Sequence, residues 1–73
     1  MTTKKRFTKR EVREIRSLLR EKATASSIKQ KNIRAKLRRM GFYITNFDQS
    51  YAGFTASDFE SLIRRRMIII IDT

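Results

Sequence analysis

Residues 8–22 read TKREVREIRSLLREK, and this stretch decides the first element of the fold. Thr8 is a good N-cap, and Glu11, three residues later, completes a capping box in which each side chain accepts a hydrogen bond from the other residue's backbone N–H. Apolar side chains then recur with the 3.6-residue period of a helix that faces a core: Val12, Ile15, Leu18 and Leu19. We therefore predict an amphipathic helix that ends near Lys22.

A second helix is predicted after a short connection. Ser27 with Gln30 offers another capping box, and Thr24 and Ser26 are alternative N-caps. Gly41 directly after the last apolar position is typical of a left-handed C-terminal stop. The predicted core stripe of this helix is Ile33, Leu37 and Met40.

Two later stretches are predicted as strands, residues 42–47 (FYITNF) and 67–71 (MIIII), because both are rich in β-branched or aromatic residues. Between them, after a loop over 48–53, Thr55 and Asp58 mark the start of a third helix with the core residues Phe59, Leu62 and Ile63. The predicted fold is small α+β, in the order helix, helix, strand, helix, strand. Three helices surround a two-stranded sheet whose strands could be parallel or antiparallel.

A chain of 73 residues forms one domain, which we place at 7–73 behind a flexible basic arm over 1–6. The chain has no Cys and no His, which excludes disulfides and thiolate sites and removes the commonest zinc ligand. We expect no cofactor and no metal. No apolar segment follows the basic start, and the longest apolar run, 67–71, is too short to span a bilayer. We expect a cytoplasmic protein without a membrane partner.

Catalytic equipment is not visible in the sequence. Gly41 and Gly53 are the only glycines, so no phosphate-cradling loop is expected. The usual general base and nucleophile, His and Cys, are missing. Asp48 is explained as a turn residue and Asp58 as helix-start chemistry, rather than as a metal pair. We predict that the protein is not an enzyme and has no small-molecule substrate.

The charge is concentrated in the first half of the chain. Of 18 Lys and Arg and 7 Asp and Glu, residues 1–40 hold 15 and 3, a net charge of +12, whereas residues 41–73 hold 3 and 4, a net charge of −1. Such an excess attracts polyanions. Charged helix faces are often merely solvated, but they usually mix both signs, and the second helix has no Asp or Glu. Nucleic acid is therefore the predicted partner, bound mainly through phosphates.

Two helical ridges are the candidate nucleic-acid-binding residues. At 100° per residue, one side of each predicted helix collects basic side chains beside the core stripe. The basic arm would add to these contacts. Asn32, Gln30 and Lys29 could read base edges, and Tyr43 and Tyr51 could stack on bases, although no known nucleic-acid motif is complete. The ridge residues are Lys9, Arg13, Arg16 and Arg20 on the first helix and Lys31, Arg34 and Arg38 on the second, where Lys29, Lys36 and the further candidate Arg39 flank the ridge.

The last strand is apolar on both faces, because alternate residues of Ile68, Ile69, Ile70 and Ile71 point to opposite sides. It is either buried inside the monomer or an edge that pairs with a second copy or another protein. A homodimer through this strand, or another protein-interaction role, is the alternative function. Either would add to the small core of a chain this short.

Residues 33–47 (IRAKLRRMGFYITNF) and 53–63 (GFTASDFESLI) resemble a group of small uncharacterised bacterial proteins. The resemblance covers the second helix to the third, about half of the chain. It implies a bacterial, cytoplasmic origin. It assigns no function and no site residue.

Overall fold

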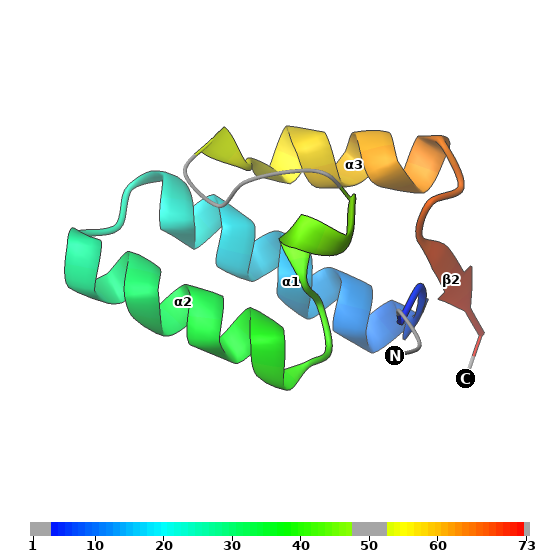
Figure 1. Ribbon diagram of the computed structural model, residues 1–73, viewed down its shortest axis with the longest axis horizontal. Coiled ribbons are helices and arrows are strands. Elements are labelled where there is room, and N and C mark those ends of the chain that lie inside the picture. The colour runs from blue at the N-terminus through cyan, green and yellow to red at the C-terminus, as the bar shows by residue number, and fades with distance from the viewer. Residues whose placement is uncertain (1–3, 48–52, 73) are drawn as a thin grey trace.

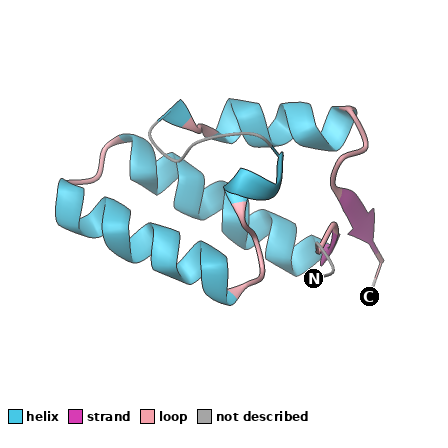
Figure 2. Cartoon of the chain, in the orientation of Figure 1, coloured by secondary structure: helices cyan, strands magenta, loops and turns pink. Residues whose placement is uncertain are grey.

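The computed structural model describes residues 4–47 and 53–72. Helix α1 (Lys9–Ala23) lies between α2 (Ser27–Arg39) and α3 (Ala56–Arg64), and the strands lie together beside the N-terminal end of α1 (Figure 1). The strands are β1 (Arg6–Thr8) and β2 (Ile69–Ile71), and a 3₁₀ helix, η1 (Ile44–Phe47), follows α2 (Figure 2). The predicted α+β class, with three helices and a two-stranded sheet, is confirmed. No helix in the described ranges is long and apolar enough to cross a membrane.

The predicted helix starts are confirmed at α1 and α3. The Thr8 N–H donates to Glu11 Oε1 at 2.9 Å, and the Glu11 N–H donates to Thr8 Oγ1 at 3.1 Å. Thr55 and Asp58 make the same reciprocal pair at α3. At α2, the N-cap is Ser26, one of the alternatives, and not Ser27. Each such cap satisfies backbone donors that the first helical turn leaves unpaired.

Helices α2 and α3 end in the same hydrogen-bonded motif. After α2, the Gly41 N–H donates to the Arg38 carbonyl at 2.9 Å and the Phe42 N–H to the Leu37 carbonyl at 3.0 Å. After α3, the corresponding bonds run from Arg66 and Met67 to the carbonyls of Ile63 and Leu62, at 3.0 Å each. This Schellman arrangement requires a left-handed residue one position past the C-cap. Gly41 takes it with φ +86°, as predicted, and Arg66 takes it with φ +60°.

The strand predicted over residues 42–47 is wrong. Its last four residues form η1, and the buried side chains of Ile44 and Phe47 are three residues apart, which is one turn of a 3₁₀ helix. The aromatic and β-branched content reflected burial and not extended backbone. The element order is therefore strand, helix, helix, helix, strand.

Strand β1 takes the place of the wrongly predicted strand. It pairs with β2 in parallel, with Arg6 opposite Ile69, Phe7 opposite Ile70 and Thr8 opposite Ile71. The Ile69 N–H donates to the Lys5 carbonyl at 2.8 Å, so the pairing begins inside the segment 1–6 that was predicted to be an arm. Residues 1–3 of that segment lie outside the described residues. Three helices thus connect two adjacent parallel strands.

Phe42 lies at the centre of the core. Its ring is fully buried and contacts the rings of Phe7, Phe47, Phe54 and Phe59, with centroids 5.4–6.0 Å apart. The four partners come from β1, η1 and the start of the α3 region, so this one residue joins segments from both ends of the chain. The Schellman turn at Gly41 reverses the backbone out of α2 and delivers Phe42 to this position.

Candidate nucleic-acid interface

Helix α2 carries basic side chains over nearly its whole surface. Its sequence, SIKQKNIRAKLRR, includes six Lys or Arg residues and no Asp or Glu. Ile33 and Leu37 fix its orientation, because both are buried against the core. The cations fall on the remaining surface, where all except the half-buried Arg34 are exposed: Lys29, Lys31, Arg34, Lys36, Arg38 and Arg39. This surface is the strongest concentration of positive charge on one described element.

Three of the predicted site residues gather around one surface hollow. Lys31, Arg34 and Arg38, together with the small side chain of Ala35, line a hollow of about 290 Å³ on the outer side of α2. Residues three, four and seven positions apart stack on the same helix face, which is why the sequence could predict this ridge. Two arginines and one lysine therefore border this hollow, and their side chains carry donors of the kind that a phosphate accepts from.

The predicted ridge on α1 is partly engaged with acidic groups. Arg16 makes a bidentate ion pair with Glu60 of α3. Its Nε donates to Glu60 Oε1, and its Nη2 donates to Glu60 Oε2 at 3.1 Å. Lys9 Nζ lies 3.2 Å from Asp72 Oδ1 just beyond β2. Arg13 and Arg20 are exposed. Half of this ridge therefore has an intramolecular carboxylate partner, which would compete with phosphate.

The predicted ridge of α1 lies on the side of that helix that faces α3. The Arg16–Glu60 pair directs the α1 ridge toward α3, whereas α2 packs along the opposite flank of α1 (Figure 1). Glu14 and Glu21 lie roughly 140–160° around α1 from Arg16, on the α2 side, at 100° per residue. These two exposed carboxylates lie between the α1 ridge and α2, with the exposed cation Arg10 one turn before Glu14 on the same side of the helix.

The residues considered for base contacts fall in different places. Asn32 and Lys29 are exposed on α2. Gln30 is half-buried, and its amide nitrogen donates to the carbonyls of Lys22 and Ala25 at 3.4 and 3.1 Å, so this donor is already used within the fold. Tyr43, between α2 and η1, is 44% exposed, as a side chain that stacks on bases must be. Tyr51, like Asp48, lies outside the described residues.

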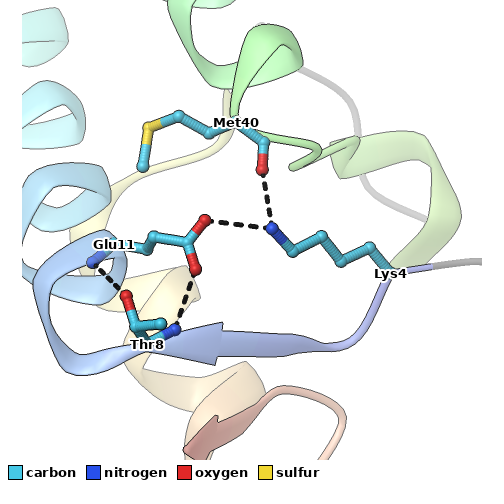
Figure 3. Close-up of polar contacts among 4 residues, drawn as sticks. All are labelled: Lys4, Thr8, Glu11 and Met40. Carbon is cyan, nitrogen blue, oxygen red and sulfur yellow. Dashed lines mark hydrogen bonds and ion pairs between the residues drawn. The ribbon is translucent and has the colours of Figure 1, made fainter. Parts of the chain in front are cut away.

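A contact that the sequence did not predict joins the N-terminal segment to the end of α2 (Figure 3). Lys4 Nζ donates to Glu11 Oε2 at 3.0 Å and to the Met40 carbonyl at 3.2 Å, and it lies 4.8 Å from the centre of the Phe7 ring. Hydrogen bonds to Glu11 hold the pKa of its carboxyl below its usual value of 4.5. The Thr8 backbone N–H is the larger cause and Lys4 the second. Lys4 is thus a structural cation and is not available as part of a mobile arm.

Lys22 is a second structural cation that sequence reasoning missed. Its side chain is only 8% exposed, and Nζ donates to the Phe54 carbonyl at 3.2 Å, just before α3. A signal existed, because Lys22 follows Leu18 by four residues and Leu19 by three and therefore continues the core stripe of α1. A lysine at such a position must find an acceptor inside the fold.

The predicted interface residues of the last strand have different environments. Ile68 is buried in the core at 2% exposure, whereas Ile69 and Ile70 are 46% and 37% exposed and Ile71 is half-buried. A hollow of about 460 Å³ beside them is lined by Ile63, Arg66, Ile68, Ile69 and Ile70. Only the outer part of this strand can therefore meet a partner.

Comparison with models of protein families, with curated proteins and with solved structures found no significant match. The resemblance of residues 33–63 to small bacterial proteins stays a prediction. Among the described residues, no group of three or more acidic side chains gathers as metal ligands would. The geometry of α2 and of β2 is therefore the basis for the proposals that follow.

Proposed function

We propose that the protein binds nucleic acid through phosphate contacts made by α2. The observation that carries this proposal is the hollow lined by Lys31, Arg34 and Arg38, on a helix with six cations and no carboxylate. Arg and Lys on one helix face can contact neighbouring phosphates, and binding of this kind releases condensed counterions. The sequence predicted contacts from both helices. The absence of acidic residues from α2, against three glutamates in α1, favours α2 as the principal surface and leaves α1 a smaller part.

Salt titration tests the proposal. The affinity for a labelled oligonucleotide, followed by fluorescence anisotropy, should fall with salt along a log–log slope of about −3 to −5 if about four to six phosphates are contacted. Replacing Lys31, Arg34 and Arg38 together by Gln should flatten the slope by about 2 to 3.

The matched control removes the same charge from α1 through Lys9→Gln, Arg13→Gln and Arg20→Gln. This variant should keep most of the slope, because the contacts on α2 remain. Equal losses in the two triple variants would mean that net charge alone drives binding, and would contradict a site on α2. Undetectable affinity at low salt would overturn nucleic-acid binding altogether.

A second candidate function rests on a different observation. Ile69 and Ile70 are exposed at the edge of a sheet with two strands in the described residues, next to an apolar hollow of about 460 Å³. An exposed apolar edge strand favours pairing with another strand. Antiparallel pairing of β2 with β2 of a second copy across a two-fold axis would use the same surface on both copies. This candidate is compatible with nucleic-acid binding by α2.

A further inference from the structure

The outer face of α2 has a composition different from that of its two sides. Ile28, Asn32, Ala35 and Arg39 follow one another at intervals of three or four residues and lie within about 60° of each other around the helix. All four are exposed, and Ile28, an apolar side chain among charged neighbours, is 77% exposed. We call these four residues the outer strip.

Cations border the outer strip on both sides. Lys31, Arg34 and Arg38 lie on one side, and Lys29 and Lys36 lie on the other, each group roughly 80–100° around the helix from the strip. A helix that touched a single phosphate strand would need cations on one side only. Two basic borders around a mixed strip match a groove with one phosphate strand on each wall.

From this arrangement we propose that α2 enters the major groove of duplex DNA, with the outer strip toward the base edges and the two basic borders toward the two phosphate strands. The inference rests on the proposed function and names its ligand class. The dimensions agree, because a helix with its side chains is about 10–12 Å across and the B-form major groove is about 12 Å wide. The strip extends about 16 Å along the helix, or about five base pairs.

The side chains of the outer strip suit base edges. An asparagine amide pairs with adenine through two hydrogen bonds, an arginine pairs with guanine in the same way, and an apolar side chain contacts the thymine methyl group. Asn32, Arg39 and Ile28 offer these three chemistries in turn. Ala35, at the middle of the strip, is small, so it lets the helix backbone approach the floor of the groove.

Other nucleic acids fit this face less well. The major groove of A-form RNA is deep and narrow, so a helix does not reach the bases. Single strands are usually held by stacking on aromatic side chains. Helix α2 has no aromatic residue, and the five phenylalanines Phe7, Phe42, Phe47, Phe54 and Phe59 are all buried. The exposed aromatic residue of the described chain, Tyr43, lies beyond Gly41 and is not part of the outer strip. Duplex DNA is therefore the ligand class that this surface favours.

The test compares one sequence as duplex DNA, duplex RNA and single-stranded DNA at a single salt concentration. We expect duplex DNA to bind at least about tenfold more tightly than either of the others. Ala35→Trp, which changes no charge, should weaken binding to duplex DNA about tenfold or more and abolish the preference. Ser57→Trp is the matched control, because Ser57 is an equally small exposed residue, on α3.

A second measurement uses the unmodified protein, so it still tests the proposal if Ala35→Trp fails to fold. Duplex DNA with glucosylated hydroxymethylcytosine has a filled major groove, and duplex DNA saturated with distamycin has an occupied minor groove. We expect the first to bind poorly and the second to bind normally. The reverse result, or equal affinity for all three nucleic acids, would overturn groove insertion while leaving phosphate binding intact. Failure to bind any nucleic acid would instead remove the proposed function itself.

Discussion

Gly41 and Arg66 occupy the same position, one residue past the C-cap, at the ends of α2 and α3. Both have positive φ, +86° and +60°, and both donate to the carbonyl three residues earlier. Glycine adopts this left-handed conformation at no steric cost, whereas a side chain with a Cβ costs about 1 kcal/mol or more. The two helices therefore end alike at different energetic cost.

We expect Arg66→Gly to stabilise the protein by about 0.5–1 kcal/mol, because it removes the left-handed strain at the end of α3. Thermal unfolding measures the effect. Arg66 also lines the hollow beside β2, so the melting temperature should be compared at two protein concentrations to separate folding from association. A melting temperature that is lower than that of the unmodified protein at both concentrations would contradict the expectation.

Gly41→Ala should destabilise the protein by about 1–2 kcal/mol, for two separable reasons. The residue has positive φ, and a Cβ built there would lie 2.9 Å from Lys4 Cδ. Combining Gly41→Ala with Lys4→Ala removes the second contact and leaves the first. In denaturant unfolding, the cost of Gly41→Ala should therefore be smaller when residue 4 is Ala. An equal cost in both backgrounds would mean that Lys4 moves aside freely.

The pH dependence of stability should include a contribution from Glu11. The Thr8 N–H and Lys4 lower the pKa of its carboxyl in the folded protein, so ionised Glu11 stabilises the fold above the unfolded pKa near 4.5. That contribution is lost as the pH falls through the lower folded pKa. Glu11→Gln keeps the cap geometry but loses the charge, so its melting temperature should fall less between about pH 5 and pH 3. Glu14→Gln, an exposed glutamate on the same helix, is the control, and an identical acid response of both variants would refute the role of Glu11.

The sequence predicts well those features that local chemistry decides. The capping boxes at Thr8 and Thr55 and the glycine stop at Gly41 are short-range patterns, and the structure contains each of them. Strand β1 could not be predicted in this way, because three residues with one apolar side chain carry no periodic signal. It exists only because β2, about 60 residues later, supplies a partner for its backbone.

The candidate site also has one part that local sequence predicts and another that depends on tertiary packing. The α2 ridge follows from helical spacing alone, since Lys31, Arg34 and Arg38 share a face whatever surrounds the helix. The ion pair between Arg16 and Glu60 depends on how α1 packs against α3, because these two residues are 44 positions apart in the sequence. Spacing within one helix cannot reveal such a partner. That the α1 ridge faces α3 could therefore be learned only from the structure.

Self-association through β2 is the last prediction. We expect the average mass in sedimentation equilibrium to rise from one chain toward two over about a hundredfold concentration range. Ile70→Lys should shift the equilibrium toward monomer, because each copy would bring a buried charge to the two-fold axis. Ile28→Lys adds the same charge to an exposed isoleucine on α2 and should leave the association unchanged.

A proline substitution tests whether association occurs through the strand edge or through the side chains alone. The Ile69 N–H bonds to Lys5 on β1, and successive N–H groups of a strand point to opposite edges, so the Ile70 N–H faces the outer edge. Ile70→Pro removes that outer donor and leaves the bonds to β1 in place. It should abolish dimers formed by backbone pairing while the melting temperature of the monomer changes little. If Ile70→Pro dimerises as well as Ile70→Val, the copies meet through side chains and not through the edge. A strictly monomeric mass of the unmodified protein at every concentration would remove the dimer.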